Sequence, residues 1–194
     1  MEKRIAKMER ETTETSICVE MNLDGVGSYD VNTGAGFLDH MLAHLSKHSK
    51  IDLTVKAKGD LEVDAHHTVE DVGICLGQCL RQALGDKKGI ARYGQSSVPM
   101  EDCMADVALD LSGRPFTIYN VNYQTERIGD FDVELIEEFF RSFVNEGKFN
   151  LHINVPYGSN SHHIAEAVFK ATGQALGSAV NIQGDDIPST KGTL

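Results

Sequence analysis

The motif His-His-x-x-Glu occurs twice in this 194-residue chain, once from His66 and again from His162. Aligned without gaps, His66–Leu84 and His162–Val180 agree at 8 of 19 positions, including both histidines, the glutamate and a later Gly-Gln. Earlier segments also correspond, since VEMNLDG matches VALDLSG and KIDLTV matches KFNLHI. The chain therefore contains an internal duplication, and two copies are too few for a solenoid.

Both copies show the same order of strand and helix patterns. Alternating apolar residues predict strands, and apolar residues recurring every three or four positions predict helices. The first copy reads as strands at 16–23 and 28–33, a helix at 37–48, a strand at 50–60 and a helix at 66–84. The second copy repeats this order at 105–111, 116–121, 132–147, 148–155 and 162–180.

These patterns predict an α+β fold made of two repeated β-β-α-β-α half-domains, in which helices cover small sheets. We expect the halves at about 1–90 and 91–184, followed by a short tail at 185–194. A chain of this length fits one domain whose two halves share a core.

Composition restricts the partners and the location of the chain. A formal net charge of −11 argues against nucleic acid and anionic membrane surfaces, because both require a basic face. No apolar run approaches the roughly 18 residues of a spanning helix, and the start lacks the apolar segment of a secretory signal. The four cysteines form no CxxC pair, so we interpret them as core residues of a cytoplasmic protein.

Spacing within the repeated motif predicts two metal sites. On a helix, residues four apart lie about 40° apart around the axis, whereas neighbours lie about 100° apart. The first histidine and the glutamate therefore share a face, and the second histidine points elsewhere. If a pseudo-twofold axis relates the halves, each such pair meets the second histidine of the other half. The two sites are then His162, Glu166 and His67, and His66, Glu70 and His163.

The duplication adds one ligand to each site. Extending the register of KIDLTV and KFNLHI back into the preceding helices places His40 opposite Glu138. We assign His40 to the site of His67, and Glu138 to the site of His163. Mixed imidazole and carboxylate ligands suit Mn²⁺, Fe²⁺ or Zn²⁺, and the spacing does not choose among them. A lone histidine is more often a core or capping residue, but this explanation fits the matched motifs poorly.

Loop residues in an acidic chain are candidates for binding a phosphate through charge-assisted hydrogen bonds. Taken singly, each is also typical of a solvated surface. They are Arg92, Arg114, Ser189, Thr190 and Lys191.

Three further histidines have weaker signals. His44 follows His40 by one helical turn, and we expect it at the surface. His48, one turn later, is within reach of an anionic substrate. His152 aligns with Thr54 of the other copy, so we expect it to have a structural role or to orient a ligand.

Five stretches occur together, in order, over essentially the whole chain: TGAGFLDHML, DAHHTVEDVG, LSGRPF, NSHHIAEAVFKA and PSTKG. This set resembles the imidazoleglycerol-phosphate dehydratase family of histidine biosynthesis. The resemblance implies two Mn²⁺ ions bridged by the imidazole ring of the substrate. It also implies a homo-oligomer of 24 subunits, in which active sites form where subunits meet.

The resemblance implies particular residues as well. The ligands of one ion would be His40, His67, His162 and Glu166. The ligands of the other would be His66, Glu70, His163 and Glu138, although many members have histidine in place of this glutamate. The substrate contacts would be Glu14, His48, Arg92, Arg114, Lys170, Ser189, Thr190 and Lys191.

The implied reaction dehydrates D-erythro-imidazole glycerol phosphate to imidazole acetol phosphate. Two cations on the ring nitrogens make the ring an electron sink, so the weakly acidic proton on the attached carbon can be removed. The C3 hydroxyl then leaves through a diazafulvene-like intermediate, and the resulting enol becomes a ketone. Carboxylates must carry the protons, and the candidates are Glu14, Glu70 and Glu166. Asp102 lies near them or is a solvated surface acid.

Two other functions fit parts of the sequence. A dinuclear hydrolase that uses metal-bound hydroxide would explain the metal sites but not the loop motifs, and turnover of another small phosphorylated substrate would favour it. A non-catalytic metal-binding oligomer would have no use for Arg92, Arg114 and Lys191, so their substitution would leave its function unchanged.

Overall fold

The two halves of the chain have the same arrangement of strands and helices. The computed structural model describes residues 4–194. The elements of the first half are β1 (Ile5–Glu11), β2 (Thr15–Asn22), β3 (Tyr29–Asn32), α1 (Gly36–Ser49), β4 (Asp52–Gly59) and α2 (His66–Leu84). Those of the second half are β5 (Tyr93–Met100), β6 (Cys103–Asp110), β7 (Phe116–Asn120), α3 (Glu134–Gly147), β10 (Asn150–Tyr157) and α4 (Ser161–Val180). A short ribbon, β8 (Arg127–Ile128) and β9 (Phe131–Asp132), precedes α3.

The sheets confirm the predicted α+β duplication. Their strand orders, β1-β2-β4-β3 and β5-β6-β10-β7, correspond strand for strand. In each sheet the last pair is parallel, and the other pairs are antiparallel. Helices α1 and α3 have 14 residues each, and strands β4 and β10 have 8 each.

Each half begins with one strand more than the sequence patterns indicated. Strand β1 has the sequence IAKMERE, in which charges dominate and only Ala6 is buried. Strand β5 has the sequence YGQSSVPM, whose glycine and proline are uncommon inside strands. Both strands lie at sheet edges, where charged residues and proline are favoured because they discourage pairing with other chains.

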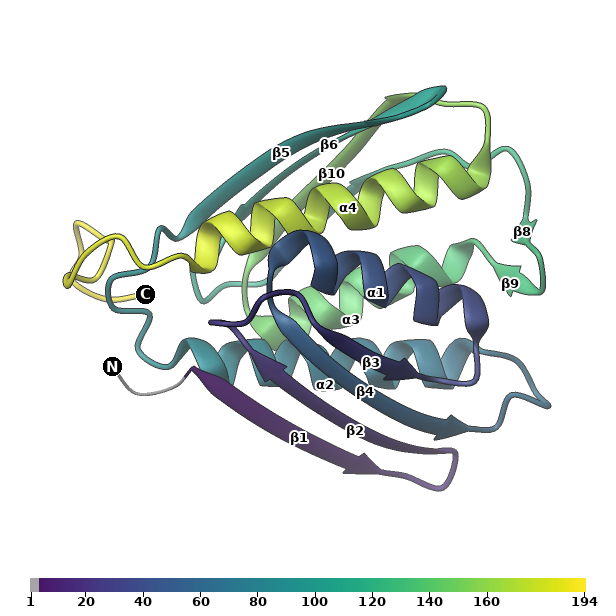
Figure 1. Cartoon of the computed structure of the whole chain (residues 1–194), viewed down its shortest axis with the longest axis horizontal. Helices are drawn as coiled ribbons and strands as arrows, with labels where there is room; N and C mark the ends of the chain where they lie inside the picture. Colours follow the sequence, from purple (N-terminus) through teal and green to yellow (C-terminus); the bar gives the residue numbers. More distant parts are fainter. Residues whose placement is uncertain (1–3) are drawn as a thin grey trace.

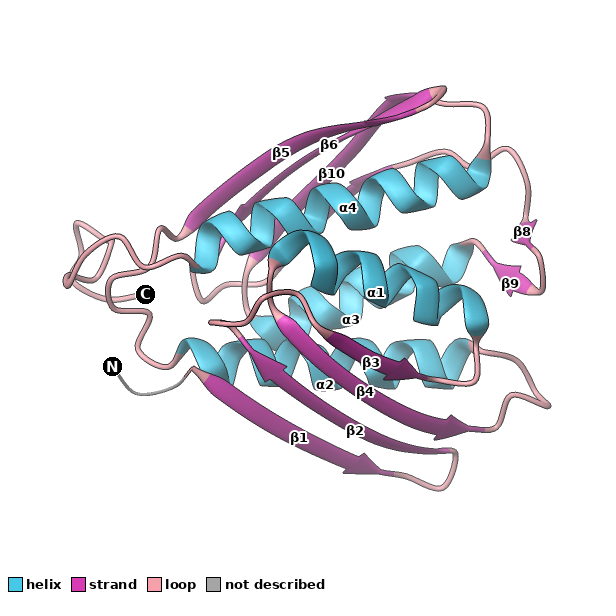
Figure 2. Cartoon of the chain, in the orientation of Figure 1, coloured by secondary structure: helices cyan, strands magenta, loops and turns pink. Residues whose placement is uncertain are grey.

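All four helices lie between the two sheets (Figure 2). Helix α1 packs against α4, and α2 against α3, so each helix pair joins the two halves. Alternate residues of the central strands face this layer, and each such valine, leucine, isoleucine or methionine side chain contributes roughly 1.5–3 kcal/mol to folding. The residues that face this layer include Ile17, Val19 and Met21 of β2 and Ala105, Val107 and Leu109 of β6.

The repeated Gly-Gln lies where the helices cross. A Cβ on Gly77 of α2 would lie 2.6 Å from the backbone of Phe143 and of Gly147 on α3. A Cβ on Gly173 of α4 would lie 2.8 Å from the carbonyl oxygen of Leu45 on α1. Contacts this close leave no room for a side chain, and both copies of the repeat have glycine at the crossing.

The helices all begin at one end of the molecule and finish at the other (Figure 1). The β1–β2 and β5–β6 turns lie at the end where the helices begin. The start of β5, the β6–β7 loop and the C-terminal tail lie at the opposite end. With 20 residues, α4 alone spans about 30 Å, so these ends are far apart.

Candidate metal centre and anion site

A cluster of three side chains, which we call the α1–α4 cluster, consists of His40, His162 and Glu166. The Oε1 atom of Glu166 lies 2.8 Å from Nε2 of His40 and 3.0 Å from Nε2 of His162. The other oxygen, Oε2, accepts a hydrogen bond of 2.6 Å from Lys170. Packing of α1 against α4 brings His40 to the other two residues, whose spacing of four places them on one helix face.

The groups around Glu166 keep its carboxylate ionised, and an ionised carboxylate can bind a cation. Burial alone would raise the pKa of Glu166, but hydrogen bonds from Lys170, His40 and His162 outweigh burial and hold that pKa well below its usual range. Glu166 therefore remains ionised at neutral pH. Glu166 is also buried, since only 7% of the residue is exposed.

His44, which we expected at the surface, is half-buried beside the α1–α4 cluster. Its Nε2 lies 3.2 Å from Nε2 of His40 and 3.5 Å from Oε1 of Glu166. Burial is the main reason that the pKa of His44 falls to about 4, so this imidazole is neutral at pH 7. Only the packing of α1 against α4 reveals this proximity, because nothing in the sequence links His44 to Glu166.

Both histidine pairs stand at the start of a helix. The side chain of Asp64 accepts a hydrogen bond of 2.7 Å from the backbone N–H of His66. Asn160 caps α4 in the same way and accepts from the backbone N–H groups of His162 and His163. Capping satisfies helix N–H groups that have no partner within the helix, and it fixes the position of the first turn.

The second histidine of each pair binds a carboxylate instead of the α1–α4 cluster. Nδ1 of His163 lies 2.7 Å from Oδ1 of Asp102, and Nδ1 of His67 lies 3.0 Å from Oδ2 of Asp60. Glu14 lies 3.8 Å from the same atom of His67. In each pair the two imidazole rings are nearly perpendicular, at 88° and 80°. Adjacent histidines therefore face different surroundings.

Asp102 is a half-buried acid that several hydrogen bonds hold in place. Its Oδ2 accepts from the backbone N–H groups of Ser159 and Asn160 and from the Ser159 hydroxyl. Hydrogen bonds from Ser159 and then His163 hold the pKa of Asp102 well below its usual range. Asp102 directly precedes β6 as Glu14 directly precedes β2, so the two acids occupy matching places in the halves.

One chain does not assemble either complete set of metal ligands from its described residues. His67 lies with Glu14 and Asp60 and not with the α1–α4 cluster. His66 and Glu70 have no hydrogen bond to each other within residues 4–194, and the first is exposed while the second is half-buried. Glu138 is the fifth residue of α3, as His40 is of α1, and it accepts a bond of 3.3 Å from Ser142.

Arg92 and Arg114 lie at the opposite end of the molecule. Asp110 binds Arg92 through two contacts of 2.7 and 3.1 Å, and the carbonyl of Pro188 accepts a third bond of 2.9 Å. These three bonds leave two of the five guanidinium N–H groups of Arg92. Arg114 is exposed in the β6–β7 loop.

The tail carries Ser189, Thr190 and Lys191 to the same end. Besides the bond from Arg92 to Pro188, the carbonyl of Asp186 accepts from the N–H of Gly89 at 2.9 Å. The tail therefore folds back beside the start of β5, and the five expected phosphate contacts lie at one end of the chain.

The anion site and the α1–α4 cluster of one chain are too far apart for one small substrate. The N–H of Arg92 donates to the carbonyl of Ala179, close to the end of α4, whereas His162 is close to its beginning. Seventeen residues at about 1.5 Å per residue correspond to roughly 25 Å. His48 lies near the end of α1, one turn beyond His44, and burial lowers its pKa.

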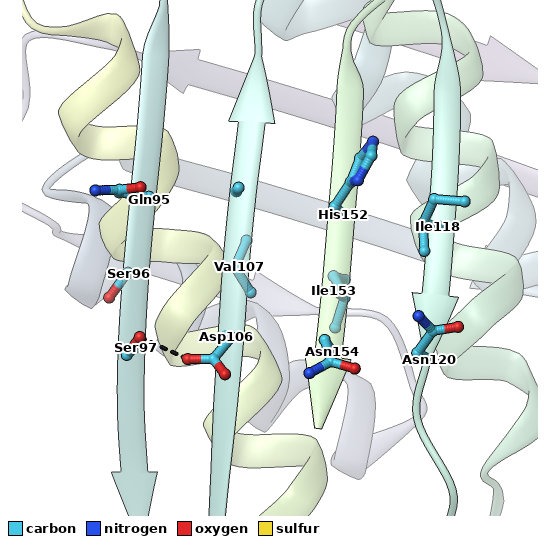
Figure 3. Close-up of a pocket in the computed structure, with 11 residues that line it drawn as sticks. Gln95, Ser96, Ser97, Asp106, Val107, Ile118, Asn120, His152, Ile153 and Asn154 are labelled. Carbon is cyan, nitrogen blue, oxygen red and sulfur yellow. Dashed lines mark hydrogen bonds between the residues drawn. The ribbon is translucent and has the colours of Figure 1, made fainter. Parts of the chain in front are cut away.

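His152 lies away from both groups. It is exposed on the outer face of the second sheet, beside Gln95, Asp106 and Asn154 (Figure 3). Its ring centroid is 6.3 Å from that of Phe116. No contact in the described chain links it to a candidate metal ligand, so it serves as a natural control residue.

The cysteines are free, and Cys75, Cys79 and Cys103 are buried as expected of core residues, whereas Cys18 is half-buried. Burial is the main cause that raises the pKa of Cys75 to about 11 and that of Cys79 to about 12. Thiols with such pKa values are poor nucleophiles at neutral pH. None of the helices in residues 4–194 is long and apolar enough to cross a membrane.

Known proteins are similar to this chain in sequence. A model of the imidazoleglycerol-phosphate dehydratase family matches residues 33–176. The imidazoleglycerol-phosphate dehydratase of Ruegeria pomeroyi is 57% identical over 194 residues, which cover 98% of this chain and 100% of the relative. That of Heliobacterium modesticaldum is 55% identical with the same coverage.

Solved structures are also similar to this chain. The crystal structure of imidazoleglycerol-phosphate dehydratase from Staphylococcus aureus has a TM-score of 0.84 at 39% identity and covers 92% of this chain and 99% of its own. That of IGPD from Pyrococcus furiosus also has a TM-score of 0.84, at 35% identity, with 96% and 100% covered. The chain thus belongs to the imidazoleglycerol-phosphate dehydratases, a family of hydro-lyases.

Proposed function

We propose that this chain is a metal-dependent dehydratase that converts D-erythro-imidazole glycerol phosphate to imidazole acetol phosphate, in the cytoplasm, as a step of histidine biosynthesis. The observation that carries the proposal is the α1–α4 cluster, in which two imidazole nitrogens and a buried, ionised carboxylate converge. Family membership supports the choice of substrate.

The side chains fit two Mn²⁺ ions. His40, His162 and Glu166 present nitrogen and oxygen donors that already lie within hydrogen-bond distance of one another. His67 supplies the remaining ligand of this ion. The ligands of the second ion are His66, Glu70, Glu138 and His163. When bound, such ions withdraw electron density from an imidazole ring and make the adjacent C–H more acidic.

Asp60 and Asp102 orient the second histidine of each pair. Each carboxylate accepts a hydrogen bond from the Nδ1–H group of its histidine, which keeps the proton on that nitrogen. The opposite nitrogen, Nε2, is then unprotonated and is available as a donor to a cation. Acids in this role raise the basicity of the imidazole and fix the direction of its ring.

Glu14 is the carboxylate best suited to carry a proton. Glu166 stays ionised and binds Lys170, so it is a poor proton donor. Glu14 is exposed in the turn between β1 and β2, and within residues 4–194 its nearest ion-pair contact is 3.8 Å from His67. We assign to Glu14 the transfer of the proton at the substrate carbon or at the C3 hydroxyl. Glu70 and Glu166 act mainly as metal ligands.

A second copy of the chain completes the active site. The roughly 25 Å between the α1–α4 cluster and the anion site exceeds the length of a small phosphorylated imidazole. The metal end of one copy therefore meets the anion end of another, where Arg92, Arg114, Ser189, Thr190 and Lys191 bind the phosphate. His48 and Lys170 contribute further contacts. In a closed assembly of 24 subunits, the metal end of every copy meets the anion end of another copy.

Incubation of the Mn²⁺-loaded protein with imidazole glycerol phosphate tests this function. We expect loss of the substrate and appearance of the ketone product by NMR, with the phosphate ester intact. Release of inorganic phosphate without ketone would instead identify a dinuclear hydrolase. No reaction at all would leave a metal-binding oligomer as the function.

A further inference from the structure

Lys87 is a buried charge without an ion pair. Among the described residues three charged side chains are buried: Asp71 and Lys87, each 6% exposed, and Glu166 at 7%. Asp71 pairs with Arg10 at 2.7 Å, and Glu166 pairs with Lys170 at 2.6 Å. No acidic oxygen of residues 4–194 lies within 4.0 Å of the Lys87 ammonium. Burying an ammonium without an ion pair costs free energy, and an anion that binds beside it would offset part of this cost.

The contacts of Lys87 place it behind the anion site. Its Nζ donates a hydrogen bond of 2.9 Å to the carbonyl of Leu111, at the start of the loop that carries Arg114. The N–H of Leu111 donates in turn to the carbonyl of Arg92 at 3.0 Å. A Cβ on Gly113 would lie 3.6 Å from the ammonium, so the loop runs directly beside it. Lys87 thus connects the backbones that position both arginines.

Positive charge exceeds negative charge around Lys87. Burial is the largest effect and lowers the pKa of Lys87, Asp110 opposes it, and Arg92 and Arg114 lower it further. Arg92 already holds both oxygens of Asp110. The three cations Lys87, Arg92 and Arg114 therefore lie near two carboxylates, Asp110 and the C-terminus at Leu194, whose carbon would lie 3.2 Å from a Cβ on Gly113. Such a concentration of positive charge attracts an anion.

We infer that Lys87 is a positioning residue for a phosphate dianion held by Arg92 and Arg114. Its hydrogen bond to Leu111 fixes the loop of Arg114, and its charge is balanced by the dianion when it binds. The inference rests on the proposed function, because the phosphate group is that of the substrate.

The matched variants Lys87→Met and Lys88→Met test the inference. Lys88 is the next residue and is exposed, so both variants remove the same charge from the same turn. For Mn²⁺-loaded Lys87→Met we expect the KM for imidazole glycerol phosphate and the inhibition constant of inorganic phosphate to rise at least about tenfold, with kcat within about threefold. Lys88→Met should leave all three within about twofold of the parent protein.

Lys87→Gln separates charge from hydrogen bonding, because glutamine keeps a donor for Leu111 without the ammonium. We expect it to lose phosphate affinity as Lys87→Met does, and Lys87→Arg to retain more affinity than either. Undiminished phosphate affinity in Lys87→Gln would overturn the inference, and so would equal losses in Lys87→Met and Lys88→Met. If Lys87→Met fails to fold, the glutamine and arginine variants decide the matter.

A second readout separates this inference from the proposed function. The rise in Tm caused by inorganic phosphate reports anion binding without turnover. If the parent protein does not dehydrate imidazole glycerol phosphate, the proposed function fails, and this rise still decides the role of Lys87. A phosphate-induced rise that Lys87→Gln retains in full would refute the inference in that case too.

Discussion

At the scale of single residues, the two histidines of each pair have different partners. His162 faces Glu166 on its own helix, whereas His163 binds Asp102 from the β5–β6 turn. The spacing of the motif predicts the divergence, because neighbouring residues on a helix point about 100° apart. Asp102 and Asp60 could not be found in this way, since each reaches its histidine from another element.

His162→Ala should remove bound metal and activity together. The variant loses one nitrogen of the α1–α4 cluster, so we expect less Mn²⁺ per chain by elemental analysis and at least about 100-fold lower turnover. His152→Ala is the control, because His152 is exposed on the outer face of the second sheet (Figure 3). Equal metal content and turnover in the two variants would remove His162 from the site.

Asp102→Asn should weaken the binding of one of the two proposed Mn²⁺ ions. Asparagine is a poorer acceptor for the Nδ1 proton of His163, and loss of an acid in this role typically reduces metal affinity about 10–100-fold. Calorimetric titration of the metal-free protein with Mn²⁺ measures this affinity apart from activity.

Asp106→Asn is the matched control for Asp102→Asn. Asp106 lies on β6 and binds the Ser97 hydroxyl at 2.5 Å, away from the histidines. We expect its metal affinities to equal those of the parent protein. If Asp102→Asn behaves in the same way, Asp102 serves only to hold the start of α4.

At the scale of helices and strands, close helix crossings hold the candidate ligands in place. Gly173 lets α4 approach α1, which brings His40 and His44 to Glu166. Gly77 lets α2 approach α3 in the matching place. The crossings therefore position the ligands as well as stabilise the core.

Gly77→Ala should destabilise the protein by about 1–3 kcal/mol, because the added Cβ meets backbone atoms that cannot move aside easily. Its Cβ would lie 2.6 Å from the N atom of Gly147. Urea denaturation measures the effect. Gly184→Ala is the control, since a Cβ there meets nothing within 4 Å. Identical midpoints for the two variants would show that the crossing tolerates a side chain.

The sequence predicts much of this level of structure. The repeated apolar patterns predict all four helices and six of the strands, and the alignment of KIDLTV with KFNLHI places His40 opposite Glu138 correctly. The sequence does not predict β1 and β5, because charges, glycine and proline obscure the alternation of apolar residues in edge strands. Nor does it predict the place of His44, which depends on how α1 and α4 pack.

At the scale of the whole molecule, the helices that carry the candidate metal ligands begin at one end, and the β6–β7 loop and the C-terminal tail, which carry expected anion contacts, lie at the other (Figure 1). In the proposed function, one chain therefore holds parts of different active sites. His67 also lies apart from the α1–α4 cluster within the chain, although helix geometry assigns it to the same ion. Both separations are resolved if copies of the chain exchange these parts in an assembly.

Mixing two inactive variants tests this exchange. His162→Ala impairs the metal end, and Arg114→Ala impairs the anion end, so each protein alone should be nearly inactive. After dissociation and reassembly together, some sites combine an intact metal end with an intact anion end. We expect the mixture to recover up to about a quarter of the parent activity by random pairing. A mixture as inactive as its components would place both ends of each site in one chain.

The most direct test of the central claim is a Mn²⁺ titration of the metal-free protein, followed by the rate at which imidazole glycerol phosphate becomes imidazole acetol phosphate. We expect no dehydration without metal, and activity that rises until two Mn²⁺ ions are bound per chain. Full dehydration by exhaustively metal-free protein would contradict the central claim.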